Sequence, residues 1–256
     1  MSLLRLDSVT RQFGGLIAVD AVSFDVPAEG LTAIIGPNGA GKTTLFNVIS
    51  GFMAPSAGHV VFAGQHITGL PPEAIAKRGL VRTFQLAQLF ENLTVLENVK
   101  VGRHLHTTGG LLAALIPFRA AHSEAEVEEA SRALLQQVGL ASQADMLAGM
   151  LPYGRKRLLE IARALAAEPK LLLLDEPAAG LNRDETTRLA SLLRQIANSG
   201  IAVLLIEHDM SLVMNVADRI AVLDFGKLIA QGTPSDVQQN PDVIAAYLGT
   251  AVATHA

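Results

Sequence analysis

One nine-residue segment constrains the fold of this chain more than any other feature of its sequence. It reads Gly36-Pro37-Asn38-Gly39-Ala40-Gly41-Lys42-Thr43-Thr44 and matches the pattern G-x-x-x-x-G-K-[ST]. The apolar run Leu31–Ile35 precedes it, and a helical pattern over 42–50, ended by Gly51, follows it. Glycines in such a turn let backbone N–H groups point inward around a chain of phosphates, and the start of the helix adds partial positive charge. The sequence therefore predicts a strand, a phosphate-binding loop and a helix, in that order.

Two side chains of this loop have a predicted role at the phosphates. Lys42 is expected to reach the β- and γ-phosphates of a nucleotide. The Thr43 hydroxyl is expected to bind Mg²⁺, a hard cation that takes few protein oxygens and keeps several of its waters. The segment therefore predicts a bound nucleotide with Mg²⁺.

A second candidate site lies where another apolar run ends in two carboxylates. The run Leu171-Leu172-Leu173-Leu174 leads directly into Asp175-Glu176-Pro177. A buried strand would bring both carboxylates to the carboxyl edge of the sheet, where ligands of open α/β sheets collect. Asp175 is predicted to hold Mg²⁺, and Glu176 to orient or deprotonate the water that attacks the γ-phosphate. Acidic residues at a strand end are commonly only solvated, so it is the nearby phosphate loop that favours a catalytic role.

A third apolar run, residues 201–206, delivers Glu207-His208-Asp209 to the same edge by the same reasoning. His208 could hydrogen-bond the γ-phosphate or the attacking water, because imidazole is both a donor and an acceptor near neutral pH. A lone histidine at a strand end is more often a surface residue. Its position equivalent to the two other strand ends favours a functional role.

Apolar runs and helical patterns alternate along most of the chain. Two further runs, 59–62 and 220–223, join those already named, and helical patterns cover 184–198 and 210–217. Runs that are apolar on both faces favour strands of a covered, mostly parallel sheet, and the alternation predicts an α/β fold. Residues 86–158 differ, because β-like runs are scarce there. In that stretch Ser123 followed by Glu126 predicts the start of a helix that runs to about Val138.

Composition excludes several classes of protein. Half of the 256 residues are apolar, which is enough for a large core and excludes a disordered chain. The net charge of -4 argues against a general nucleic-acid binder, so no nucleic-acid partner is expected. The absence of cysteine excludes disulfides and thiolate metal sites. No signal-peptide core opens the sequence and no run reaches the ~20 apolar residues that span a bilayer, so any membrane role is expected to act through partners.

In the order and spacing of these motifs, the chain resembles the ATPases of the ABC family along almost its entire length. The phosphate loop is followed by Gln85 in Arg82-Thr83-Phe84-Gln85, by residues 151–155, by Asp175-Glu176 and by His208. The resemblance implies an α/β P-loop NTPase sandwich with a mixed, mainly parallel core sheet, an N-terminal antiparallel β subdomain and a helical subdomain. It places the nucleotide-binding core at 1–86 and 159–256, and the helical, signature-bearing subdomain at 87–158. It further implies that the bound nucleotide is ATP.

The resemblance also implies roles for two residues that would be unremarkable alone. Gln85 would contact Mg²⁺ or water and sense a membrane subunit. Phe13 lies where the family stacks an aromatic ring on adenine, which any ring can do. A core phenylalanine is the alternative for Phe13.

Residues Leu151-Pro152-Tyr153-Gly154-Arg155 occupy the place of the family's LSGGQ signature, which caps the γ-phosphate of ATP held by an opposing subunit. Pro152, Tyr153 and Arg155 depart from that pattern, whereas Gly154 matches it. A helix start with its free N–H groups can still bind an anion, so the capping role is retained as an expectation. Arg155 is hypothesised to compensate electrostatically.

Several segments further resemble the ATPase subunits of branched-chain amino-acid importers. They are residues 11–19 (RQFGGLIAV), 82–85 (RTFQ), 177–182 (PAAGLN), 205–210 (LIEHDM) and 240–249 (NPDVIAAYLG). The resemblance implies a second ATPase subunit, a paralogue or a second copy, that completes an ATP-sandwich dimer. It also implies two transmembrane permease subunits and, indirectly, an extracytoplasmic solute-binding protein. The chain would lie at the cytoplasmic face of the inner (plasma) membrane, held peripherally by its partner subunits.

Four alternatives remain open at the level of sequence. An importer of urea or another amide-like solute would share these segments. An ABC ATPase of DNA repair or translation usually carries two cassettes or long coiled-coil insertions, and neither is present. A module that binds ATP without hydrolysing it is disfavoured by Glu176 and His208. A small-molecule kinase would share the phosphate loop but would not need Gln85, the signature and His208.

Overall fold

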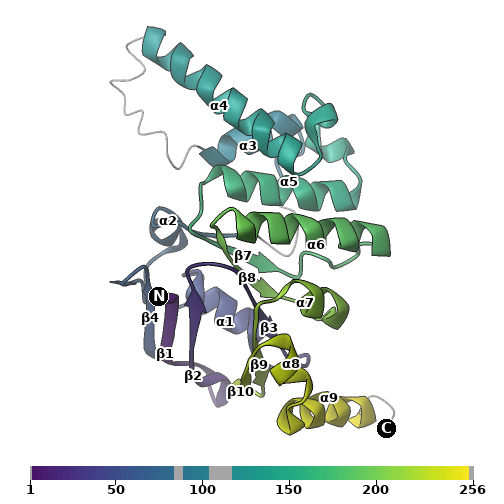
Figure 1. Ribbon diagram of the computed structural model, residues 1–256. Coiled ribbons are helices and arrows are strands. Elements are labelled where there is room, and N and C mark those ends of the chain that lie inside the picture. Colours follow the sequence, from purple (N-terminus) through teal and green to yellow (C-terminus); the bar gives the residue numbers. More distant parts are fainter. Residues whose placement is uncertain (1, 84–88, 104–116, 254–256) are drawn as a thin grey trace. The chain divides into compact units, whose positions relative to one another are not determined.

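The computed structural model describes residues 2–83, 89–103 and 117–253, and the side chains of these residues except 117–123 and 248–253 (Figure 1). They form two compact units. The first unit comprises 1–82, 170–178 and 193–256, and the second comprises 83–169 and 179–192. Of the domain limits expected from the sequence, the one at 86 lies outside the described residues and the one at 158 falls within a helix, so that division stays a prediction.

A six-stranded sheet forms the centre of the first unit. Its strand order is β10-β9-β3-β8-β7-β6, and all neighbours pair in parallel except β9 and β10, which pair antiparallel. The strands are β3 (Leu31–Ile35), β6 (Leu80–Arg82), β7 (Leu171–Asp175), β8 (Ala202–Ile206), β9 (Arg219–Asp224) and β10 (Lys227–Gly232).

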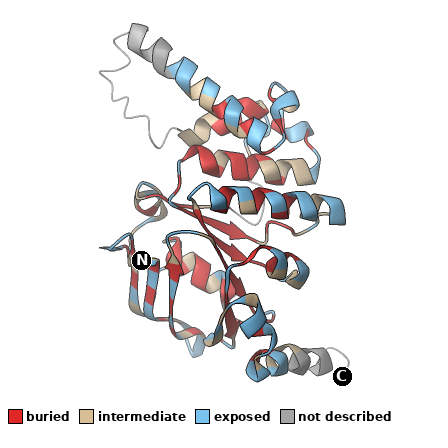
Figure 2. Cartoon of the chain, in the orientation of Figure 1, coloured by how far each residue is buried: buried red, intermediate tan, exposed pale blue. Residues whose placement is uncertain are grey.

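Hydrophobicity explains why β3, β7 and β8 lie in the middle of this sheet. Every residue of the three strands is buried, as Figure 2 shows by colour. Strands covered on both faces need continuous apolar runs rather than alternation, and these three have them. The mainly parallel core sheet predicted from the sequence is therefore present.

A second, four-stranded antiparallel sheet belongs to the same unit, in the order β2-β1-β4-β5. Its strands are β1 (Ser2–Phe13), β2 (Leu16–Pro27), β4 (Ala57–Phe62) and β5 (Gln65–His66). The N-terminal antiparallel β subdomain that the resemblance implied is thereby confirmed, and run 59–62 belongs to it and not to the parallel sheet that its apolar residues favour. Only part of β4 is buried, which is typical of an antiparallel sheet with one face on the core and the other exposed.

Helix α1 (Lys42–Ile49) contributes Leu45, Phe46 and Ile49 to one core cluster that also takes side chains from both sheets. The helix begins directly after the phosphate loop, so the packing of these apolar residues fixes the loop against the first unit. The other helices of this unit are α2 (Pro72–Ala76), α7 (Met210–Val216), α8 (Pro234–Gln238) and α9 (Pro241–Ala253), and α6 (Arg183–Asn198) runs from the second unit into the first.

The second unit is mainly helical within its described residues, as expected for this stretch. It contains the α-helices α3 (Val95–Arg103), α4 (Pro117–Gln137) and α5 (Tyr153–Ala166). Two short 3₁₀ helices, η2 (Ala141–Gln143) and η3 (Ala148–Met150), lie between α4 and α5. Helices α3, α4 and α5 pack on one another. Gly102 allows the close approach of α3 to α5, since an added Cβ would overlap the carbonyl oxygen of Arg163.

The predicted helix start at Ser123 was wrong, because α4 begins at Pro117. The spacing of serine or threonine and glutamate does form a capping box at another place. Thr94 Oγ1 accepts from the Glu97 amide at 3.1 Å, while the Thr94 amide donates to Glu97 Oε2 at 2.7 Å. The same pattern in a helix interior carries no start signal, since its backbone N–H groups already have intrahelical partners.

No helix among those described combines the length and the apolar character required to cross a membrane.

Replacing Phe46 by alanine should reduce the free energy of unfolding by about 3–5 kcal/mol, because the ring is fully buried in the core cluster and its removal leaves a cavity. Phe225, whose residue is 84% exposed, provides the matched control, and Phe225→Ala should change stability by less than about 0.5 kcal/mol. Urea unfolding followed by circular dichroism measures both. Equal effects of the two substitutions would contradict the assigned core.

Candidate functional site

The carboxyl ends of three parallel strands meet at one edge of the core sheet. Register places Asp175 of β7 beside Ile206 of β8, and Ile206 beside Ile34 of β3. Each strand is then followed by one of the predicted motifs. The amide of Glu176 donates to Ile206 O at 3.0 Å, which extends the β7–β8 pairing to the second carboxylate. The phosphate loop, Asp175-Glu176 and His208 are thereby brought together, as predicted.

Residues 36–44 form a tight loop that requires glycine at specific points. Gly36 has φ 149° and Gly41 has φ 95°, and an added Cβ would overlap Leu223 O at the first and Ala18 O at the second. Gly39 has φ 80°, and a Cβ there would meet nothing within 4 Å. The loop is therefore packed tightly where it touches the protein and open at its tip.

The backbone of this loop presents donors that the protein itself does not use. Within the described part of the chain, the N–H groups of Gly39, Gly41, Lys42, Thr43 and Thr44 have no acceptor. Such donors at a helix start attract a phosphate or another anion. The loop therefore fits the triphosphate of a nucleotide, whose oxygens would accept from these N–H groups.

Lys42 is buried beside the loop that it serves, with 8% of the residue exposed. Its Nζ donates to Gly36 O at 2.6 Å and to Pro37 O at 2.8 Å. Burial lowers the pKa of Lys42, while the charges of Glu176 and Asp175 act in the opposite direction. The Lys42 ammonium thus lies between the loop carbonyls and the carboxylates of Asp175 and Glu176. A phosphate bound there would form a charge-assisted hydrogen bond with it.

Asp175 is 2% exposed and forms an ion pair with Arg82 of β6, with 2.8 Å between Oδ2 and Nη2. The same guanidinium donates to Asn47 Oδ1 at 2.7 Å and to Ser50 Oγ at 2.9 Å, at the end of α1. Arg82 therefore connects the predicted Mg²⁺ ligand to the helix that carries the phosphate loop. In the sequence Arg82 stands only as part of a motif, and no role was predicted for it.

The side chains of Glu176 and His208 approach each other at the sheet edge. His208 Nδ1 lies 3.9 Å from Glu176 Oε1, and the side chains of His208 and Glu176 are 60% and 24% exposed. Glu176 has φ 46°, in the left-handed region that non-glycine residues seldom adopt. Backbone strain of this kind clusters at functional sites and persists only where surrounding contacts enforce it.

Glu207 is a fully buried carboxylate next to these residues. Its Oε1 accepts from the Ala178 amide at 2.8 Å, and its Oε2 accepts from the His208 amide at 3.1 Å. Burial raises the pKa of Glu207, and these backbone donors lower it in part. Sequence patterns place Glu207 at this edge without a role, because burial cannot be read from a charged residue after a strand. Asp209, its neighbour, caps α7 by accepting from the Ser211 and Leu212 amides.

Phe13 lies at the end of β1 and is 41% exposed, so it is not a core residue. The Arg11 guanidinium lies over its ring, 4.6 Å from the centroid. The hairpin that starts at Phe13 leads to Ala18, whose carbonyl oxygen faces Gly41 of the phosphate loop. Stacking of Phe13 on adenine stays a prediction.

Residues 151–155 enter the first turn of α5, with Pro152 as the residue before the helix. Gly154 permits close packing, since a Cβ there would overlap the Glu185 carboxylate. Arg155 Nη1 donates to Gly139 O at 2.8 Å, after the end of α4. These residues belong to the second unit, and their role toward a nucleotide stays a prediction. Gln85 lies outside the described residues.

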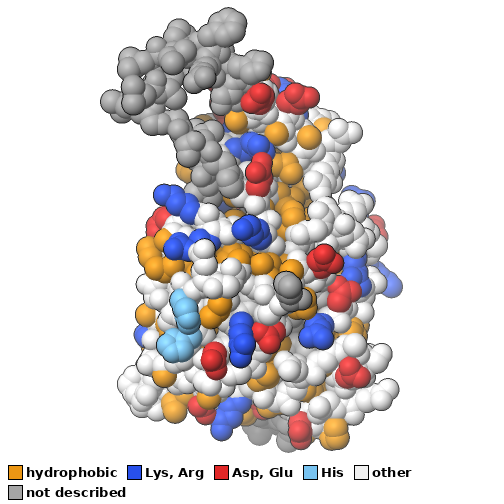
Figure 3. All heavy atoms as spheres, turned by 60° about the vertical axis from the view of Figure 1, so that its left-hand side comes forward, with side chains coloured by type: hydrophobic (Ala, Val, Ile, Leu, Met, Phe, Trp, Pro, Cys, Tyr) orange, Lys and Arg blue, Asp and Glu red, His pale blue; other side chains and the backbone are white. Residues whose placement is uncertain are grey.

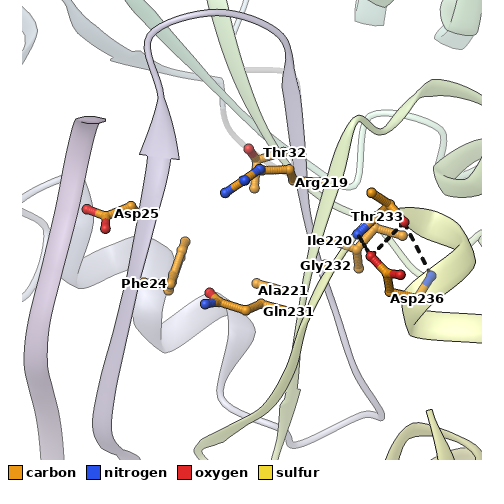
Figure 4. A pocket seen from close by; sticks show the side chains of 10 residues that line it. All are labelled: Phe24, Asp25, Thr32, Arg219, Ile220, Ala221, Gln231, Gly232, Thr233 and Asp236. Atoms are coloured by element: carbon orange, nitrogen blue, oxygen red, sulfur yellow. Dashed lines mark hydrogen bonds between the residues drawn. The ribbon is translucent and has the colours of Figure 1, made fainter. Parts of the chain in front are cut away.

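A cavity of about 210 Å³ lies in the first unit, at the end of the core sheet opposite the phosphate loop (Figure 4). Thr32 near the start of β3 and Arg219 at the start of β9 line it, so it is separate from the phosphate loop. On the molecular face in Figure 3, basic and acidic side chains are interspersed. Among the described residues, no group of three or more His, Asp or Glu has the arrangement of a metal site.

Two family models match the sequence. Residues 19–179 match the model described as ABC transporter, and residues 227–253 match one described as branched-chain amino acid ATP-binding cassette transporter. The second segment reaches the phosphate loop, because Tyr247 of α9 forms a hydrogen bond with the backbone of Gly36.

Curated relatives match along nearly the whole chain. The high-affinity branched-chain amino acid transport ATP-binding protein LivG of Escherichia coli (strain K12) is 46% identical over 253 residues, 97% of this chain and 98% of that protein. The corresponding protein BraF of Pseudomonas aeruginosa is 45% identical over 251 residues, with the same coverage.

A solved structure supports the fold independently. The ADP conformation of an ATP-binding cassette of an ABC transporter is similar with a TM-score of 0.85 at 35% identity, covering 97% of this chain and 99% of that one. The predicted ABC ATPase fold is confirmed. Because the family model covers more than half of the sequence and the relatives cover almost all of it, the chain belongs to the ABC transporter family as one of its ATP-binding cassettes.

Proposed function

We propose that this chain is the ATP-hydrolysing subunit of an ABC importer that energises uptake of branched-chain amino acids or a related small solute through separate membrane subunits. The main support for ATP hydrolysis is that a phosphate loop with unused N–H donors lies at the same sheet edge as Glu176 and His208. The relatives of 45–46% identity and the family match over 227–253 support the class of solute.

Binding of ATP is assigned to the loop and its lysine. The free amides of residues 39 and 41–44 donate to the phosphates, and Lys42 exchanges its bonds to Gly36 O and Pro37 O for the β- and γ-phosphates. Thr43 and Asp175 are the residues proposed to hold Mg²⁺, which neutralises charge on the phosphates when bound. Phe13 is proposed to stack on adenine.

Hydrolysis is assigned to Glu176 with His208 beside it. Glu176 orients the attacking water and accepts its proton, because it follows β7 at the sheet edge that carries the phosphate loop, where its charge acts on Lys42. His208, whose side chain is largely exposed, is placed to hydrogen-bond the γ-phosphate or that water. Gln85 is proposed to contact Mg²⁺ or water.

The active site is proposed to be completed by a second ATPase subunit, a paralogue or another copy. Gly154 and Arg155, at the start of α5, would cap the ATP bound by the opposing phosphate loop. ATP then acts as a ligand that favours the closed dimer, and hydrolysis removes that preference. Two transmembrane permease subunits, supplied with solute by an extracytoplasmic binding protein, would hold the dimer at the cytoplasmic face of the inner membrane.

Replacing Lys42 by alanine should raise the Kd for ATP about 10- to 100-fold, since the substitution removes charge-assisted hydrogen bonds worth ~1.5–3 kcal/mol. Lys227 supplies a control of equal charge, because its side chain is 67% exposed and lies 3.5 Å from Asp20. Lys227→Ala should leave the Kd within about twofold of wild type. Calorimetric titration with ATP measures both Kd values. Equal affinities of the two variants would contradict the assignment of Lys42 to the phosphate site.

Replacing Glu176 by glutamine should lower ATP turnover at least about 100-fold and leave ATP binding intact, because it removes the proton acceptor but not the phosphate loop. Glu168→Gln is the matched control, since Glu168 also has a positive φ, of 45°, but its side chain is 58% exposed and pairs with Arg103. Phosphate release measures turnover, and native mass spectrometry with ATP and Mg²⁺ measures the dimer. Turnover at the wild-type rate in the Glu176→Gln variant would contradict the assignment.

The solute class is tested by uptake. Cells that lack this chain should lose uptake of radiolabelled leucine, regain it with the wild-type chain and fail to regain it with Glu176→Gln. Retained leucine uptake with loss of urea uptake would favour the importer of an amide-like solute instead.

A further inference from the structure

Glu207 holds two backbone segments of the site with one side chain. Its Oε1 accepts from the amide of Ala178, two residues after Glu176, and its Oε2 accepts from the amide of His208. A third amide, that of Asp209, lies 3.5 Å from Oε2. The side chain is fully buried, so its carboxylate depends on these amides rather than on water for hydrogen bonds.

The segment that Glu207 holds on one side contains a strained residue. Glu176 has φ 46°, while its amide is bound to Ile206 O at 3.0 Å. Conformations of this kind are rarely populated and need surrounding contacts to persist. The bond from Ala178 to Glu207 closes the turn on the other side of Glu176, so the strained residue lies between two fixed amides.

We propose that Glu207 is a positioning residue for ATP hydrolysis, which holds Glu176 and His208 at their working separation by binding the backbone on either side of the pair. This inference rests on the proposed hydrolytic function. Glu207 does not touch the reacting atoms in this assignment. Its effect passes through the backbone of Ala178 and of His208, and through the His208 ring, whose Nδ1 lies 3.8 Å from Glu207 Oε2 and 3.9 Å from Glu176 Oε1.

A carboxylate is the group that this position requires. Both of its oxygens accept, so one side chain satisfies amides from two segments. A glutamine of the same length can accept from Ala178 with its oxygen, but its NH₂ group would then face the His208 amide, donor against donor. Alanine would leave the buried Ala178 amide and the part-buried His208 amide without this acceptor. The raised pKa of Glu207 agrees with the cost of burying this group, which the amide donors offset in part.

The first test compares kcat with nucleotide affinity in the purified full-length chain. Glu207→Ala should lower kcat about 10- to 100-fold, the range expected when catalytic groups are misplaced by about 1 Å, and leave the Kd for ATP within about twofold. Glu207→Gln should retain more of kcat than Glu207→Ala, because it keeps one of the two main bonds. The double variant Glu207→Ala/His208→Ala should lose less kcat than the product of the two single fold-losses, since both substitutions act on the same pair of side chains.

Asp218 provides a matched control at the other end of the sheet. Its Oδ2 accepts from the amide of Leu31, the first residue of β3, at 2.7 Å, and Arg194 binds its other oxygen. Asp218→Ala also removes a carboxylate from a backbone amide, but kcat should stay within about twofold of wild type. A loss of kcat in Glu207→Ala no larger than in Asp218→Ala would reduce Glu207 to a structural group and overturn the proposal.

Hydrogen exchange tests the positioning without relying on turnover. In Glu207→Ala, the amides of Ala178 and Glu176 should exchange faster than in wild type, and in Asp218→Ala the faster exchange should appear at Leu31 instead. Unchanged exchange at Ala178 would overturn the proposal, whether or not the chain hydrolyses ATP. Absence of turnover in the wild-type chain, with faster exchange in Glu207→Ala, would instead count against the proposed function.

Discussion

Parallel backbone pairing of β3, β7 and β8 is the constraint on which the site depends. In a parallel sheet all strands end at the same edge, so the residues that follow them are neighbours although they lie far apart in the chain. Ile34 pairs with Ile206, and Ile206 pairs with Asp175, so the register fixes which residue of each strand lies at this edge. A slip of one residue in the β7–β8 ladder would turn Asp175 to the other face of the sheet.

The groups gathered at this edge are polar, and several of them are buried, so the protein satisfies them pairwise. Arg82 neutralises Asp175 and also binds the end of α1. Glu207 accepts hydrogen bonds from the amides of two segments. Buried charges of this kind are costly unless paired and hydrogen-bonded, so each of these contacts restricts the positions available to its partners. In the phosphate loop the amides are left unused, and a ligand is what would satisfy them.

Local sequence patterns predicted the strands and helices of the first unit well where hydrophobicity was continuous. The runs that became β3, β7, β8 and β9 were assigned to within about one residue. The predictions that failed depended on context. Run 59–62 joined the antiparallel sheet, because a short apolar run does not encode which neighbour it pairs with. The predicted helix start at Ser123 lies inside α4, because a capping pattern only acts where a helix has free amides.

For the candidate site, the residue order alone was enough to specify the chemical groups: the glycine loop with Lys42 and Thr43, the carboxylates Asp175 and Glu176, and His208. Spacing and residue type suffice for these, because a phosphate loop is a local structure built from consecutive residues. The folded chain was needed to find the contacts of Arg82 and Glu207, the exposure of Phe13 and the positive φ of Glu176. Each of these depends on burial and on contacts between residues distant in the chain, and neither property is encoded in a short stretch of sequence.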